Sequence, residues 1–124
     1  MKAAIYPGQG KPIVIEDVPE PDVFLIPGGE GNRPLMEDQR ILDWVRHAHE
    51  HSTWTTSVCT GSLLLGAAGV LEGKRATTHW AYRDTLPEFG AESVVARFVE
   101  DGKVMTAAGV SAGIDMSLAL VGRM

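Results

Sequence analysis

The only cysteine of the chain, Cys59, marks an abrupt change from one local sequence pattern to another. Residues 55–58 before it favour a strand, whereas residues 61–69 after it are small and aliphatic and favour a helix. This order predicts a strand that ends at Cys59 and a helix that begins directly after it. Unpaired backbone N–H groups at the start of a helix favour a thiolate over a thiol. Cys59 is therefore a candidate nucleophile, with a small buried core residue as the alternative.

The rest of the chain continues this alternation of strands and helices. Residues 23–26 are continuously apolar, as expected for a strand buried on both faces, and residues 36–50 carry apolar side chains at helical spacing. Asp101 and Gly102 are expected to form a tight turn, and Ser111 to cap the last helix. The remaining predicted elements are strands at 76–78, 94–99 and 103–107 and helices at 81–89 and 111–124. The alternation predicts an α/β fold with a largely parallel sheet covered on both faces.

The first 22 residues follow a different pattern. Residues 2–6 and 12–18 are predicted to be the strands of a β-hairpin, joined by a turn at residues 7–10. We therefore expect a hairpin segment at 1–22 and a main domain at 23–124.

Length and composition exclude several classes of function. The chain of 124 residues has room for one domain, and its net charge of −5, without a basic block, argues against nucleic acid as a partner. The longest strongly apolar run, residues 63–71, is too short to cross a bilayer, and the N-terminus lacks the apolar core of a signal peptide. A single cysteine suits a reducing compartment. We expect a soluble, cytoplasmic protein without a membrane partner.

Three passages resemble the ThiJ/PfpI superfamily of class I glutamine-amidotransferase-like domains. Residues 57–80 are similar to the nucleophile-elbow region of that family, and residues 106–115 are similar to a later motif that precedes a helix. With Pro27-Gly28-Gly29, the resemblance runs from about residue 23 to the C-terminus. It is closest to the isonitrile hydratase branch and to the amidotransferase-like domains of AraC-type regulators. The resemblance implies a flavodoxin-like three-layer sandwich.

The chain departs from this family pattern at both ends. Residues 1–22 resemble the opening of zinc-type medium-chain alcohol dehydrogenases, but none of the zinc or nucleotide motifs of those enzymes follows. The strand–helix–strand unit that normally delivers an acidic side chain to the family cysteine is not recognisable, and the C-terminal helix of the family is cut short at Met124. We therefore expect an altered N-terminal hairpin and a truncated C-terminus.

The resemblance also implies a set of site residues around Cys59. It places the backbone N–H groups of Thr60 and of Gly28 or Gly29 beside the sulfur, where such donors stabilise charge that develops on a substrate. It puts His79 near the thiolate as a partner or proton shuttle, with a hydrogen-bonded packing histidine as the alternative.

The acidic partner of the cysteine is less well defined. Alternation turns Glu16 or Asp17 inward if their strand joins the sheet, whereas the alternative leaves both carboxylates solvated. Asp115 is a candidate substrate-binding residue, with stabilisation of the N-terminus of the last helix as the alternative. Without such an acid, the thiolate is expected to form adducts and not to complete turnover.

These residues predict a cysteine-dependent hydratase or hydrolase that resembles the isonitrile hydratases, which convert an isonitrile to an N-substituted formamide. The alternatives are a non-catalytic ligand-binding or sensor domain and an inactive oligomerising fragment. We expect a small-molecule substrate, no cofactor and, because relatives in the family are commonly dimers, a homodimer or higher homo-oligomer.

A histidine-rich helix end at residues 47–51 raises the question of a metal site. His47 and His51 are one helical turn apart, but His49 points elsewhere on a helix. Zinc needs three or four converging ligands. The sequence therefore predicts a polar helix end and no metal site.

Overall fold

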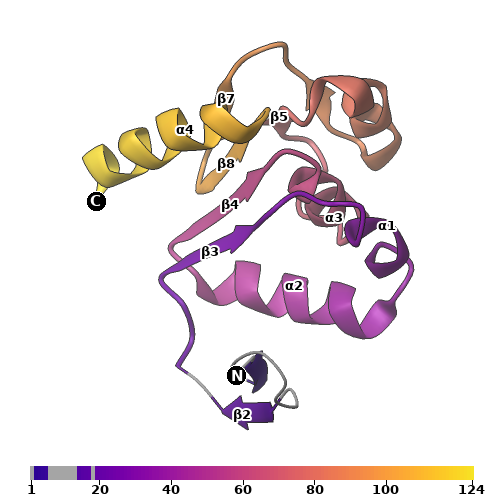
Figure 1. Ribbon diagram of the computed structural model, residues 1–124, viewed down its shortest axis with the longest axis vertical. Coiled ribbons are helices and arrows are strands. Elements are labelled where there is room, and N and C mark those ends of the chain that lie inside the picture. Colours follow the sequence, from indigo (N-terminus) through magenta and orange to yellow (C-terminus); the bar gives the residue numbers. More distant parts are fainter. Residues whose placement is uncertain (1, 6–13, 18) are drawn as a thin grey trace.

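The computed structural model describes residues 2–5, 14–17 and 19–124 (Figure 1). At the N-terminus, β1 (Lys2–Ile5) and β2 (Val14–Asp17) pair antiparallel. These strands confirm the predicted hairpin pairing, whereas the predicted turn at 7–10 lies outside the described residues. Within the described part of the chain, the pair forms a two-stranded sheet of its own and is not hydrogen-bonded to the main sheet.

The main sheet has four strands in the order β3-β4-β8-β7. Its members are β3 (Val23–Ile26), β4 (Trp54–Val58), β8 (Val104–Ala107) and β7 (Phe98–Asp101). The first three are parallel, and β7 runs antiparallel to β8 through the predicted tight turn, where Gly102 has a φ of 62°. Because β4 lies between two parallel neighbours, the carboxyl ends of β3, β4 and β8 meet at one edge of the sheet.

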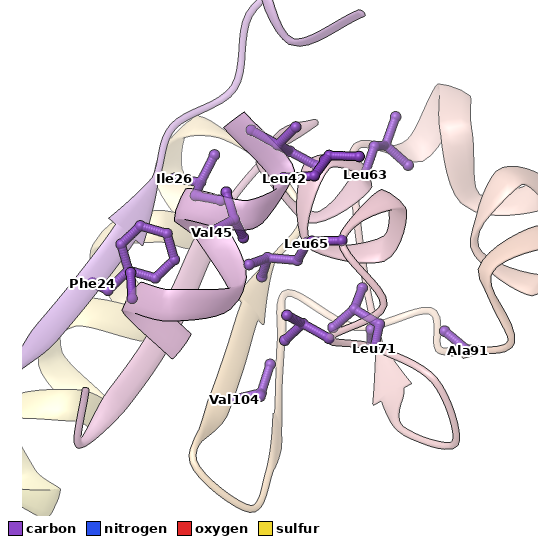
Figure 2. Packing of buried hydrophobic residues seen from close by; sticks show 14 of the residues in the cluster. Phe24, Ile26, Leu42, Val45, Leu63, Leu65, Leu71, Ala91 and Val104 are labelled. Atoms are coloured by element: carbon purple, nitrogen blue, oxygen red, sulfur yellow. The ribbon is translucent and has the colours of Figure 1, made fainter. Parts of the chain in front are cut away.

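Helices cover both faces of this sheet (Figure 1). On one face, α2 (Gln39–His51) and α3 (Gly61–Ala67) enclose the larger apolar core, in which Phe24 and Ile26 of β3 meet side chains of both helices (Figure 2). On the other face, α4 (Val110–Arg123) covers a smaller core that includes Met105 and Met116. The predicted three-layer α/β sandwich with a mostly parallel sheet is confirmed.

Four smaller elements complete the fold: α1 (Asn32–Leu35), β5 (Arg75–Ala76), η1 (Trp80–Phe89) and β6 (Glu92–Ser93), which pairs with β5. The sequence does not predict α1, because four residues are too few to show a helical period. The helix predicted at 81–89 is the 3₁₀-helix η1, which contains Pro87, a residue without an N–H to donate. The strand predicted at 76–78 ends at Ala76, since the Thr77 N–H donates to the Thr106 side chain.

Three predicted element boundaries are wrong by a few residues. The helix predicted to start at residue 36 starts after Asp38, whose side chain accepts a hydrogen bond from the Arg40 N–H. The last helix starts before Ser111, so Ser111 is not its cap; its hydroxyl instead accepts a hydrogen bond from Arg97 at 3.2 Å. The strand predicted at 94–99 starts only at Phe98.

The prediction that residues 23–26 are buried on both faces is wrong for one face. Phe24 and Ile26 are buried under α2, but Leu25, which alternation turns to the opposite face, is 46% exposed. Among the described strands, β3 has one hydrogen-bonded neighbour, β4, and α4 packs mainly against β8 and β7. Among the described strands β3 is therefore an edge strand, and its second face is covered only in part, at Val23, which packs against the smaller core.

Across the part of the chain that the structure describes, each helix is too short or too polar to cross a bilayer.

Replacing Leu65 by alanine tests how much of the stability depends on the larger core. Leu65 of α3 is fully buried, so Leu65→Ala leaves a cavity and should lower the free energy of unfolding by about 2–5 kcal/mol. The control is Val95→Ala, where the valine is 76% exposed and the change should stay within about 0.5 kcal/mol. Urea unfolding of both variants measures the difference, and equal losses would contradict this assignment of the core.

Candidate active site

Cys59 lies where β4 passes into α3, and its backbone is left-handed, with a φ of 58°. Among the described residues it is the one non-glycine with a positive φ, a conformation that is unfavourable for a residue with a side chain. Its N–H donates to the Ala107 carbonyl at 2.9 Å, and its own carbonyl accepts from the hydroxyls of Thr78 at 3.0 Å and Ser62 at 3.3 Å. Hydrogen bonds to β8, to α3 and to the segment after β5 therefore hold the predicted strand-to-helix turn, with the cysteine half-buried.

The loop that follows β3 passes directly against this cysteine. A Cβ placed on Gly28 would lie 2.7 Å from the Cys59 Cβ and 3.1 Å from its Sγ. Both distances are shorter than ordinary contacts, so glycine is what lets the loop approach the thiol this closely. The Asn32 side chain donates to the Pro27 carbonyl at 3.0 Å and ties the loop to α1.

Thr60 organises the same loop through its side chain. The Gly29 N–H donates to the Thr60 Oγ1 at 3.0 Å, and the hydroxyl in turn lies 3.4 Å from the Gly29 carbonyl oxygen. The Gly29 N–H is therefore already engaged and is a poorer oxyanion donor than the sequence suggests. Within the described part of the chain, the backbone N–H groups of Gly28 and Thr60 have no hydrogen-bond partner.

His79 reaches the site through the segment that follows β5. The buried Thr77 and Thr78 dock this segment: the Thr77 N–H donates to the Thr106 hydroxyl at 2.9 Å, and the Thr78 hydroxyl donates to the Cys59 carbonyl. The His79 Nδ1 accepts a hydrogen bond from the Ala81 N–H at 3.2 Å and caps η1. A neutral ring that accepts at Nδ1 carries its proton on Nε2, so the second ring nitrogen is a donor.

A cavity of about 620 Å³ opens beside the cysteine. Its volume suits a small molecule. Of the predicted site residues, it brings together Cys59, Thr60, Gly29 and His79. The cavity is lined by Gly29, Glu30, Asn32, Arg33, Met36, Cys59, Thr60, Leu63, His79 and Tyr82.

Several lining residues are not predicted from the sequence. Glu30 directly follows the Pro-Gly-Gly loop, which is the one sequence signal that could have identified it. Asn32 and Arg33 belong to α1, which has no sequence pattern of its own. The Arg33 guanidinium lies 5.6 Å from the centre of the Tyr82 ring, a cation–π distance, so two remote segments close one side of the cavity.

Two of the predicted acidic residues, Asp17 and Asp115, lie outside this cavity lining. Asp115 is in the second turn of α4, not the first, and forms an ion pair with Arg97. Glu16 and Asp17 lie on β2, which among the described strands pairs with β1 alone. The condition for turning one of them toward Cys59, a strand that joins the main sheet, is therefore not met.

The sequence of this chain is similar to those of known proteins. The sequence profile of the DJ-1/PfpI family matches residues 13–123. Isonitrile hydratase from Pseudomonas putida is 56% identical over 105 residues, which are 85% of this chain and 46% of that protein. The HTH-type transcriptional regulator CdhR from Pseudomonas aeruginosa is 31% identical over 103 residues, which are 80% of this chain and 30% of that protein.

A solved structure gives the same result for the fold. The crystal structure of a ThiJ/PfpI family protein from Pseudomonas syringae has a TM-score of 0.81 and 42% sequence identity to this chain. The match covers 85% of this chain and 44% of that one. The chain thus spans less than half the length of each of these relatives.

Gly28→Ala tests the close approach of the loop to the thiol. The added methyl must displace either the loop or the sulfur, so we expect slower alkylation of native Cys59 and a loss of about 1–3 kcal/mol of unfolding free energy. Gly31→Ala is the matched control, because a Cβ at Gly31 meets no atom within 4 Å. Intact mass after timed exposure to iodoacetamide gives the rate; the same rate in both variants would show that Gly28 does not crowd the thiol.

Proposed function

The chain belongs to the DJ-1/PfpI family, and we propose that it acts there as a cysteine-dependent isonitrile hydratase. The left-handed turn at Cys59 carries this proposal, because it places a half-buried thiol at a cavity large enough for a small substrate. The 56% identity to the Pseudomonas putida isonitrile hydratase supports the choice of substrate class.

In the proposed reaction the Cys59 thiolate adds to the terminal carbon of the isonitrile. That carbon takes up a proton, which gives a thioimidate bound to the sulfur. Water then adds to the same carbon and the nitrogen becomes protonated. Cleavage of the carbon–sulfur bond, with loss of a proton from the added oxygen, returns the thiolate and releases an N-substituted formamide. The net reaction consumes one isonitrile and one water and needs no redox partner.

Charge that develops during thiolate attack needs hydrogen-bond donors. The N–H groups of Thr60 and Gly28 are the donors we propose, since both lack a partner within the described residues and both flank the sulfur. We assign Thr60 a second role, in which its hydroxyl holds the loop at Gly29. In the tautomer inferred above, His79 would donate from Nε2, so we propose that it hydrogen-bonds the thiolate or the substrate nitrogen.

Glu30 is the carboxylate that we propose for proton delivery and placement of water. It lines the same cavity as Cys59 and His79, whereas Asp17 and Asp115 do not. An exposed carboxylate at the cavity mouth can exchange protons with solvent between turnovers.

A non-catalytic ligand-binding domain is the second candidate. The similarity to the regulator CdhR over 80% of this chain favours it, because that relative is a transcriptional regulator. Such a domain would bind an isonitrile or a related small molecule and leave it unchanged.

We also propose a homodimer or higher homo-oligomer and a cytoplasmic location. Four exposed aliphatic side chains of α4, at helical spacing, provide an apolar surface that a second copy could cover: Val110, Ile114, Leu118 and Val121. A single half-buried thiol suits a reducing compartment.

Cys59→Ser tests the proposed activity. With a simple alkyl isonitrile as substrate, we expect the wild-type chain to produce formamide and Cys59→Ser to lose at least about a thousandfold in rate, because serine is a far weaker nucleophile. Proton NMR of the formyl hydrogen follows the product. Saturable binding of the isonitrile without product in both proteins would favour the ligand-binding candidate and reject the hydratase.

Glu30→Gln separates adduct formation from turnover. We expect this variant to form the Cys59 thioimidate and to release formamide about a hundredfold more slowly, because general acid–base catalysis typically contributes that much. Intact mass detects the trapped adduct. Glu37→Gln, an exposed carboxylate outside the cavity lining, is the control and should retain wild-type turnover. Normal turnover by Glu30→Gln would remove Glu30 from the proposed mechanism.

A further inference from the structure

Three potential metal ligands meet at the C-terminal end of α2, outside the lining of the Cys59 cavity. His47 and His51 lie one turn apart on the helix, and Glu20 comes from the segment between β2 and β3. One ligand atom from each of these side chains lies within 4.8 Å of the other two. The fold thus supplies the third ligand that the helix sequence lacks.

Glu20 and His47 are already in direct contact. The His47 Nε2 lies 3.1 Å from both carboxylate oxygens of Glu20. The hydrogen bond from His47 holds the pKa of the Glu20 carboxyl below its ordinary value. His47 therefore presents Nε2 on the side where the Glu20 carboxylate lies.

His51 has the second contact that metal-binding histidines usually have. Its Nδ1 lies 2.9 Å from the backbone carbonyl oxygen of His47, and because a carbonyl can only accept, Nδ1 carries the proton. The lone pair of the neutral ring is then on Nε2, the nitrogen available to a metal. The His47 and His51 rings are stacked, with centroids 4.2 Å apart, so both imidazoles face the same side of the helix end.

His49, the third histidine of the helix end, does not belong to this group. Its Nδ1 lies 2.8 Å from the Thr55 Oγ1 on β4, on the part-buried side of α2. The structure therefore separates the two candidate ligand histidines from a third that takes part in packing.

We propose that Glu20, His47 and His51 bind a divalent transition metal ion of the zinc class. Two imidazoles and one carboxylate are a ligand set that Zn²⁺ accepts, with water at the remaining position. With bonds of roughly 2.0–2.2 Å, the ligand atoms of a tetrahedral site lie about 3.3 Å apart. The three ligand atoms lie within 4.8 Å of one another, so small side-chain rotations would bring them to this distance. The ion would replace the Glu20–His47 hydrogen bond and link the segment that precedes β3 to α2. This site is independent of the proposed hydratase activity.

A calorimetric titration of the tag-free, metal-stripped chain with Zn²⁺ tests the site. We expect one ion per chain, and Glu20→Gln, His47→Gln and His51→Gln should each weaken binding at least about tenfold. Co²⁺ should give the visible absorption of a low-symmetry site in the wild type. Zn²⁺ should also raise the melting temperature of the wild type by about 4 °C or more and leave the three variants nearly unchanged.

Matched controls identify other sources of binding. His49→Gln and Glu50→Gln lie on the same helix end outside the cluster and should bind Zn²⁺ within about twofold of wild type, as should Cys59→Ser. Loss of binding in Cys59→Ser alone would place the metal on the thiol and overturn the proposal. Absence of binding at millimolar Zn²⁺, or affinity unchanged in all three ligand variants, would also overturn it.

Discussion

At Cys59 the backbone takes a left-handed conformation that costs a residue with a side chain on the order of 1 kcal/mol or more. The hydrogen bond from its N–H to Ala107, and the bonds that its carbonyl accepts from Thr78 and Ser62, keep the chain in this conformation. The rest of the site depends on these bonds. They turn the chain from β4 into α3 within two residues and connect the elbow to β8 and to the segment that carries His79.

The loop after β3 depends on the elbow in turn. Gly28 has space for no side chain beside the thiol, and the Thr60 hydroxyl holds the next peptide through Gly29. The Gly29 N–H is therefore engaged in holding the loop, whereas the neighbouring Gly28 N–H has no hydrogen-bond partner among the described residues. The loop, α1, the start of α3 and η1 then line the cavity together with the elbow.

The N-terminal segment is joined to this sandwich in a different way. Its β-ribbon does not extend the main sheet within the described residues, so backbone hydrogen bonds of the sheet do not connect the two. A side-chain contact does link the segment between β2 and β3 to α2, because Glu20 reaches His47 across 27 positions of the sequence. A contact between two solvent-exposed groups is weak by itself. The proposed metal ion would strengthen this contact.

The sequence predicts the parallel strands, the helices α2, α3 and α4, and the strand-to-helix turn at Cys59. Their hydrophobic patterns and glycines are local signals, so no tertiary information is needed. The family resemblance further predicted that Thr60, His79 and either Gly28 or Gly29 lie near the sulfur. Only the tertiary structure decided that Leu25 is exposed, that the Gly29 N–H is engaged by Thr60, and that Asp115 pairs with Arg97.

The positions of the acidic residues at the two candidate sites, Glu30 and Glu20, were also decided by the tertiary structure. Glu30 lines the cavity because α1 and η1 fold over the elbow, and α1, a helix of one turn, has no sequence pattern of its own at that length. Glu20 meets His47 and His51 because the path of the chain into β3 runs past the end of α2. Sequence determines local conformation through short-range patterns, whereas the meeting of remote side chains depends on how completed elements pack, and no local pattern encodes it.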